Sequence, residues 1–324
     1  MRRRDRKDRL RLRVGGLRLK RARRKKTSLA HKALAGFAIL AAVAAAGLLI
    51  FYLVQSQRLH GEQSALRKAY HEQATDTAAP SPEPTLYPMP DPVVVFAGQV
   101  TQAPLTPPVI QERQAASDRF IPLMRRNNDV VGWLTYPAFS EMDFVVVHRD
   151  NTHYLYRSFT GERNLAGTVF LEEGNSIRPR DANLILHGHN MADGTMFGKL
   201  ARLLDPAILR REPLLRFDTL YQDALYVPYA LTIFSINSAA SDYFDVVQTS
   251  FNTPEAMVDY VNWLRAHSLL DFPTQIQQDD RLLTLVTCHG QDDDERLALA
   301  LRAVRPGEDT GALRAQLETQ IARR

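Results

Sequence analysis

The sequence predicts a mainly β domain, built as a barrel with added helices, that follows one membrane-spanning helix. Three observations lead to this prediction. One uncharged apolar run is long enough to cross a membrane, the body after it contains many short segments rich in Val, Ile, Leu, Phe and Tyr, and these segments do not alternate regularly with helices. Regular alternation is typical of a doubly wound sheet, whereas many short strands with few helices favour a barrel.

The first 32 residues form a strongly basic tail. They contain 16 Lys and Arg but only two Asp, which leaves 25 basic and 34 acidic residues in the rest of the chain. Clustered basic side chains attract the phosphates of nucleic acids without needing a fold. The apolar run that follows directly indicates instead the cytoplasmic flank of a membrane anchor. We therefore predict a cytoplasmic tail over residues 1–32 and no nucleic-acid partner.

Residues 33–54 form an uncharged apolar run of 22 residues, and no second run of comparable length follows. A helix of this length, at about 1.5 Å per residue, crosses a hydrocarbon core of about 30 Å. Because basic flanks stay in the cytoplasm, the chain after residue 54 is expected outside the cell membrane. A cleaved signal peptide or a buried core helix is the alternative, but a signal peptide has a shorter apolar core that ends at small residues. We predict a single-pass membrane protein with its N-terminus in the cytoplasm.

Residues 55–108 are expected to separate the anchor from the folded body. The first part is polar with scattered Leu and is expected to continue the anchor helix as a stalk to about Tyr70. Nine of the 18 prolines of the chain lie between Pro80 and Pro108. Proline removes backbone donors and restricts φ, so this stretch predicts an extended spacer.

The folded body is expected over residues 109–306, opened by a short helix. Thr253 to Ser268 is predicted as a helix, with Thr253 as its N-cap and Pro254 in its first turn, and residues 195–204 as another. The tail, residues 307–324, is polar and predicts a frayed terminal helix. The predicted strands are 130–135, 143–148, 168–171, 183–186, 225–236, 282–288 and 297–304.

Cys288 is the only cysteine of the chain. Exported domains often use disulfides, and a lone thiol cannot form one within the chain, so it is either an inert buried residue or a reactive nucleophile. Cys288 ends a predicted strand where the chain enters a polar loop, and Arg296 opens the next strand eight residues later. A hairpin would bring the thiol and the guanidinium to the same end of the sheet.

Two histidines, His187 and His189, follow the apolar strand 183–186. They alternate and could share one face of a strand, which would suit a metal, but no convincing third and fourth ligand lies nearby. We therefore predict no metal and no cofactor. The acid run from Asp292 to Glu295 is interpreted as a solvated loop and not as a calcium site.

The segment Gly-His-Asn-Met-x-x-Gly-Thr-Met-Phe (188–197), followed by Thr-Leu-x-Thr-Cys (284–288) and Arg296, resembles the sortase family, and class B sortases in particular. Further likeness in order covers residues 120–304. The resemblance implies an eight-stranded sortase-type β-barrel with Cys288 as nucleophile, His189 as acid and base, and Arg296 as stabiliser of the carbonyl oxygen. Thr287 should point away from Cys288, which leaves packing and a substrate contact as equal readings of its side chain.

The resemblance also implies a membrane-anchored cysteine transpeptidase of a Gram-positive cell. Its donors would be surface proteins or pilins with a C-terminal sorting signal, and its acceptor an amine of a peptidoglycan precursor or of a pilin. A cysteine hydrolase of the same fold and a catalytically silent surface scaffold remain the alternatives. The sequence departs from the family pattern at two positions near the expected site. His187 precedes Gly188 where an aromatic or small residue is common, and His289 with Gly290 follows Cys288 where an aromatic-containing stretch is common.

Overall fold

The computed structural model describes residues 29–76, 112–289 and 294–324, and its contacts divide the chain into two units, Met1–Leu53 and Val54–Arg324. Most of the expected basic tail, the proline-rich spacer and the start of the acid run at Asp292 lie outside the described residues.

Helix α1 (Leu29–Asp76) is continuous through the expected anchor and the expected stalk. Within the described residues it is the one helix long and apolar enough to cross a membrane, with a mean hydropathy of 2.6 in its most apolar window. The large side chains of the anchor part are exposed, Leu40 by 72% and Phe37 by 74%. Exposed apolar side chains on every face are what a lipid-embedded helix presents, so α1 is a candidate membrane span.

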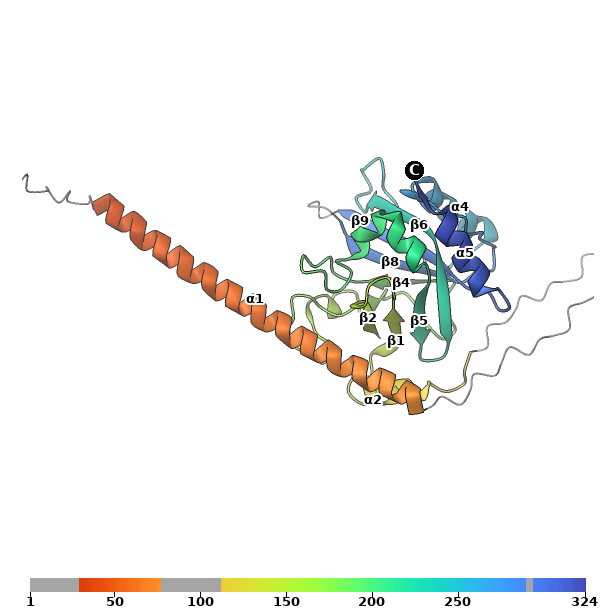
Figure 1. The fold of residues 1–324 in the computed structure, drawn as a ribbon, viewed down its shortest axis with the longest axis horizontal. Coiled ribbons are helices and arrows are strands. Elements are labelled where there is room, and N and C mark those ends of the chain that lie inside the picture. Colours follow the sequence, from red (N-terminus) through yellow and green to blue (C-terminus); the bar gives the residue numbers. More distant parts are fainter. Residues whose placement is uncertain (1–28, 77–111, 290–293) are drawn as a thin grey trace, which may run out of the picture. The chain divides into compact units, whose positions relative to one another are not determined.

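Eight strands close into a barrel in the order β1-β2-β3-β4-β8-β9-β6-β5, which confirms the predicted eight-stranded, mainly β fold (Figure 1). Two neighbouring pairs, β2 with β3 and β4 with β8, are parallel and the others antiparallel. The strands are β1 (Val130–Thr135), β2 (Asp143–His148), β3 (Phe170–Leu171), β4 (Asn183–His187), β5 (Leu215–Thr219), β6 (Asp223–Ser235), β8 (Leu282–Cys288) and β9 (Glu295–Ala303).

Helices and short turns pack around the barrel strands. They are η1 (Asp118–Phe120), α2 (Ile121–Met124), η2 (Tyr154–Tyr156), η3 (Leu200–Leu204), α3 (Pro206–Arg211), α4 (Pro254–Ala266) and α5 (Thr310–Gln320). Strands β7 (Leu270–Asp271) and β10 (Ala322–Arg323) form a separate two-stranded sheet. Thr253 caps α4 by accepting a hydrogen bond from the Ala256 amide at 3.2 Å, as the sequence predicts.

Two of the predicted helices differ from the helices of the structure. The helix expected over 195–204 is reduced to the 3-10 turn η3, because the residues before it bend the backbone into the left-handed region, with φ of 81° at Gly194 and 48° at Met196. The terminal helix α5 is packed and not frayed. Leu313 and Leu317 recur at helical spacing, and both are buried, as is Ile321 beyond the helix end.

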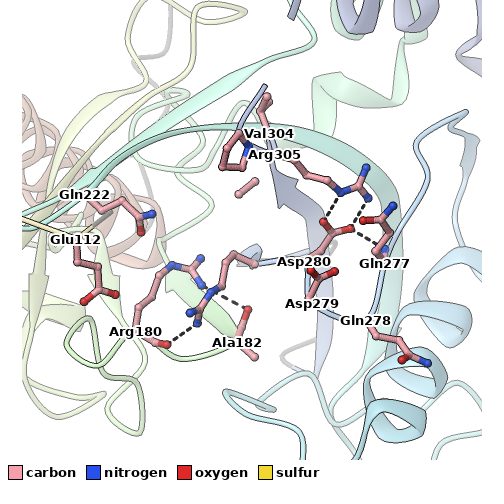
Figure 2. Close-up of a pocket in the computed structure, with 13 residues that line it drawn as sticks. Glu112, Arg180, Ala182, Gln222, Gln277, Gln278, Asp279, Asp280, Val304 and Arg305 are labelled. Carbon is pink, nitrogen blue, oxygen red and sulfur yellow. Dashed lines mark hydrogen bonds and ion pairs between the residues drawn. The ribbon is translucent and has the colours of Figure 1, made fainter. Parts of the chain in front are cut away.

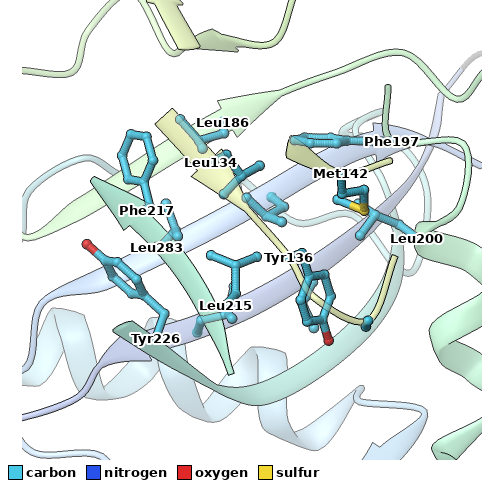
Figure 3. Packing of buried hydrophobic residues seen from close by; sticks show 14 of the residues in the cluster. Leu134, Tyr136, Met142, Leu186, Phe197, Leu200, Leu215, Phe217, Tyr226 and Leu283 are labelled. Atoms are coloured by element: carbon cyan, nitrogen blue, oxygen red, sulfur yellow. The ribbon is translucent and has the colours of Figure 1, made fainter. Parts of the chain in front are cut away.

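The alternation of side chains along the strands divides the core into an inner cluster and two clusters on the outside of the barrel, one of which contains Trp133 of β1. Leu134, Leu186 and Leu283 point from three strands into the barrel interior, where Phe197 and Leu200 join them (Figure 3). On β4, β8 and β9 the residues at the alternate positions point outward and are covered by α4. This outer cluster contains Ile185, Leu282, Val286, Ala298 and Ala300 from the strands and Met257, Tyr260, Val261 and Leu264 from α4.

The end of α1, within the barrel unit, docks against the outside of β1. Leu66 and Tyr70 are buried there, and Leu59 packs on the inner cluster, although the sequence predicts a stalk. The Tyr70 ring stacks on Trp133 with ring centroids 4.3 Å apart, and its hydroxyl donates to Asp218 Oδ2 at 2.9 Å. Burial beside Asp218 raises the pKa of Tyr70 well above its usual value, so this hydroxyl stays protonated as a donor.

We expect Tyr70→Ala to destabilise the barrel unit by about 3 kcal/mol, because it removes a buried aromatic ring and leaves Asp218 short of one donor. In thermal unfolding this corresponds to a decrease of roughly 6–12 °C in the melting temperature. Lys68→Ala, on the exposed side of the same helix, is the matched control and should change the free energy of unfolding by less than about 0.5 kcal/mol. Equal melting temperatures for the two variants would show that the docking contributes nothing.

Candidate active site

The hairpin of β8 and β9 places Cys288 directly opposite Arg296. One register step inward on the same face, Val286 pairs with Ala298, and both belong to the outer cluster beneath α4. Because side chains two residues apart share a face, Cys288 and Arg296 lie at the barrel end on its outer face. The thiol is exposed and Arg296 is half-buried. The sulfur is therefore open to a substrate and is not sealed in the core.

His189 reaches the same barrel end from the neighbouring strand. Strand β4 runs parallel to β8, with His187 paired to Val286, and the Gly188 amide donates to the Val286 carbonyl at 3.3 Å. The chain therefore passes beside the end of β8 as it reaches His189. The strands β4, β8 and β9 are adjacent, and the three residues that the sequence singles out lie at one end of them: His189 in the turn after β4, Cys288 at the end of β8 and Arg296 at the start of β9.

The His189 ring is held by a backbone carbonyl. Its Nε2 lies 2.7 Å from the Leu155 oxygen, and its ring centroid lies 5.3 Å from that of Tyr156. A carbonyl oxygen only accepts hydrogen bonds, so Nε2 must carry the proton in this arrangement. Nδ1 is then the nitrogen left to take up or release a proton toward a substrate.

The Gly-His turn depends on the packing of its own motif. A side chain at position 188 would place its Cβ 2.8 Å from the Phe197 ring, so glycine is required there. The Phe197 amide donates to the His189 carbonyl at 2.9 Å. Phe197 is fully buried in the inner cluster and so ties the turn that carries His189 to the barrel core. The turn therefore needs both the glycine directly before His189 and the phenylalanine eight residues after it.

Thr287 is buried, and its hydroxyl donates to the Gly188 carbonyl at 2.8 Å. This bond links the end of β8 to the turn before His189. The placement favours a structural role for the hydroxyl in joining the two catalytic candidates, while a substrate contact of Thr287 stays a prediction.

His187 is engaged in a separate arrangement beside the site. Its ring stacks on Phe170, and its Nε2 lies 2.8 Å from Glu172 Oε2. Burial raises the pKa of the Glu172 carboxyl, but the hydrogen bonds from His187 and Asn151 outweigh it and hold that pKa below its usual value. Within the described residues no group of three or more His, Cys, Asp and Glu side chains could hold a metal ion.

Two of the neighbours of this site escape sequence-based reasoning. The Leu155 carbonyl that orients His189 is a backbone group. Every residue has such a group, so the residue type does not reveal its role. Glu172 directly follows the predicted strand that ends at Leu171. A carboxylate at the end of a buried strand could have been recognised as a partner for one of the two histidines. Asn151, which donates to Glu172 Oε1 at 2.6 Å, lies 21 residues away in the chain.

Comparison with known proteins supports one family. The chain is 30% identical over 180 residues to a sortase B of Listeria monocytogenes, covering 55% of this chain and 70% of that protein. It is 26% identical over 171 residues to a sortase B of Staphylococcus aureus, covering 52% and 67% respectively. No protein-family model matches the chain.

Solved structures show the same fold. A Staphylococcus aureus sortase B–substrate complex superposes with a TM-score of 0.61 at 16% identity, covering 78% of this chain and 99% of that one. A sortase B complexed with triglycine gives a TM-score of 0.60 at 17% identity, covering 77% and 99%. At these identities the likeness concerns the fold alone, and it confirms the predicted sortase-type barrel.

We expect Glu172→Gln to lower the stability of the barrel at neutral pH by about 1 kcal/mol, because the charged acceptor of two hydrogen bonds is lost. The folded-state pKa lies below the usual 4.5, so the contribution of the carboxylate is complete above about pH 4.5 and is lost as the pH falls through the folded-state value. Chemical unfolding of the parent and of Glu172→Gln at several pH values from 7 to 3 measures the difference in their free energies of unfolding.

The difference between the two proteins should therefore shrink on acidification. Glu318→Gln, on the exposed side of α5, is the control and should leave stability within about 0.5 kcal/mol of the parent at every pH. A difference for Glu172→Gln that stays constant over this pH range would contradict a role for the ionised carboxylate.

Proposed function

This chain belongs to the sortase B family of cysteine transpeptidases, and on that premise we propose that Cys288, His189 and Arg296 carry out its reaction. The observation that carries the proposal is the register of three adjacent strands, which pairs Cys288 with Arg296 and brings the turn with His189 to the same barrel end. A thiol, an imidazole and a guanidinium together supply a nucleophile, an acid and base, and an oxyanion stabiliser.

In the first half-reaction the Cys288 thiolate attacks a peptide carbonyl carbon of the donor protein. The carbonyl oxygen becomes negatively charged, and the guanidinium of Arg296, opposite Cys288 in the hairpin, stabilises it. His189 protonates the departing amine as the C–N bond breaks. The products are a thioester on Cys288 and the released C-terminal fragment of the donor.

In the second half-reaction an amine attacks the thioester. The amine nitrogen forms the new peptide bond, its proton passes to His189, and the C–S bond breaks to return the thiolate. The solved sortase B complexed with triglycine supports an amine as acceptor, and the solved substrate complex supports a bound donor. For this chain we propose an amine of a peptidoglycan precursor or of a pilin.

The donor is proposed to be a surface protein or pilin with a C-terminal sorting signal. Exposed apolar side chains lie on both sides of the catalytic candidates, where an extended peptide would need them. Tyr156 packs against His189 and is 52% exposed. On the other side lie Ile236 and Tyr243, which are 41% and 40% exposed. Ile236 directly follows β6, whose Phe234 pairs with Arg296, and Tyr243 forms an isolated β-bridge with Ser235. We propose that the sorting signal binds between these two groups.

We further propose that α1 anchors the enzyme in the cell membrane, with the basic tail in the cytoplasm and the barrel outside the cell. The apolar character of residues 33–54 and the basic residues before them support this orientation. An extracytoplasmic barrel would meet its donors after their export.

We expect Cys288→Ala and His189→Ala each to lower acyl transfer by about 10³-fold or more, because each removes a group that the reaction requires. His187→Ala is the matched control: it removes an imidazole two residues away that is bound to Glu172, and most of the activity should remain. Transfer of a fluorescent sorting-signal peptide to an amine measures all three. The opposite ranking of the two histidines would refute the assignment of His189.

The exposed thiol is also open to water, so hydrolysis of the thioester is the competing second step. Mass spectrometry of the products, with and without an added amine, separates the two outcomes. We expect the amide product when the amine is present and free acid only in its absence. Free acid alone under both conditions would make the protein a cysteine hydrolase. A thiol-reactive probe that labels the parent and not Cys288→Ala tests whether the sulfur is reactive at all.

A further inference from the structure

The end of the barrel opposite Cys288 contains a cavity of about 390 Å³. It lies where β4 and β8 begin and β9 ends, and its lining includes Arg180 and Ala182 before β4, Arg281 before β8 and Val304 after β9. These are the strands whose other ends carry the catalytic candidates. Seven residues of β8 at about 3.3 Å per residue separate the two ends by roughly 20 Å, so the cavity is distinct from the active site.

Arg180 forms one wall of the cavity and is 6% exposed. Its terminal nitrogens donate to the carbonyls of Asp181, at 2.6 Å, and Leu282, at 2.9 Å, and to the Tyr226 hydroxyl at 3.2 Å. These partners are neutral, and no ion pair joins Arg180 to a carboxylate in the part of the chain that the structure describes. Its Nε has no hydrogen-bond partner within the same residues. A buried guanidinium without a counter-charge is costly, which is a reason to look for an external anion.

Arg281 brings a second positive charge to the same wall. One of its nitrogens donates to the Arg180 carbonyl at 2.7 Å. This bond holds the two arginines side by side, and burial, together with the charge of Arg180, lowers the pKa of the Arg281 guanidinium, although Glu112 and Asp181 act in the opposite direction. An arginine has five N–H donors, and among the described residues this is the one hydrogen bond of the Arg281 side chain.

The acidic residues of the cavity do not neutralise this wall. Asp280 lies on the opposite side, where it accepts two hydrogen bonds of 2.7 Å from Arg305 (Figure 2). Its charge is therefore already matched. Asp279 and Glu112 also line the cavity, but both are exposed to solvent, which screens their charge, so Glu112 offsets only part of the effect of burial and Arg180 on Arg281. Gln222, Gln277 and Gln278 add amide groups that can donate hydrogen bonds.

We propose that this cavity binds an oxyanion, the carboxylate or phosphoryl group of a small ligand, through Arg281 with Arg180 beside it. The planar guanidinium of Arg281 offers paired donors that match either group. The volume lies within the range of small-molecule sites, so the anionic group is expected to belong to a larger molecule whose remainder contacts the glutamine amides. The proposal is independent of the proposed function, because it uses none of the catalytic candidates.

The test is isothermal titration of the full-length chain, in uncharged detergent at constant ionic strength, with inorganic phosphate and separately with acetate. We expect saturable binding at one site for at least one of the two probes. Phosphate alone would assign a phosphoryl ligand, acetate alone a carboxylate, and both together the shared oxyanion. Arg281→Gln should weaken binding by at least about 10-fold, the effect of losing a charge-assisted hydrogen bond.

Arg178→Gln is the matched control. It removes the same charge close to Arg180 in sequence, but Arg178 is exposed and does not line the cavity, so binding should change by less than about 2-fold. Arg281→Lys keeps the charge without the planar donors and should bind more weakly than the parent but more tightly than Arg281→Gln. Cys288→Ala should bind as the parent does. The proposal is overturned if neither probe binds saturably or if Arg281→Gln binds as tightly as Arg178→Gln.

Discussion

The pairing of β4, β8 and β9 is the constraint on which the rest of the structure depends. Parallel pairing of β4 with β8 and antiparallel pairing of β8 with β9 fix which residues meet at each barrel end. A slip of one residue in β8 would turn Cys288 toward the barrel interior and leave Arg296 opposite Thr287. The apolar alternation of Leu283 and Leu285 inward with Leu282 and Val286 outward opposes such a slip, so the packing of the core also specifies the site.

Much of this arrangement was predictable from the residues themselves. Val130–Thr135, Asp143–His148 and Leu282–Cys288 have the predicted bounds, because β-branched and apolar residues run there between clear breaks. Strand β5 was missed, since it is short and carries Arg216 and Asp218, whose charges suggest a loop. Asp218 is buried, and although its salt bridge to Arg216 is local to the strand, its partner Arg119 is 99 residues away and is brought to it only by the fold.

The catalytic candidates were visible in the sequence, but their surroundings were not. A single thiol, a Gly-His turn and an arginine at hairpin spacing are marks of residue type and position. The carbonyl of Leu155, the docking of Tyr70 on Trp133 and the buried charge of Arg180 depend on contacts between segments far apart in the chain. Such contacts are set by topology, and the chemistry of each residue alone does not reveal them.

The bond between His189 and Leu155 has a consequence for the order of events in the proposed reaction. With Nε2 committed to the carbonyl, one ring nitrogen must serve both the departing and the entering amine. Two molecules cannot occupy that position at once. The cleaved fragment therefore has to diffuse away before the acceptor binds, which makes the kinetics ping-pong. The lifetime of the acylated enzyme is then set by the supply of the acceptor amine.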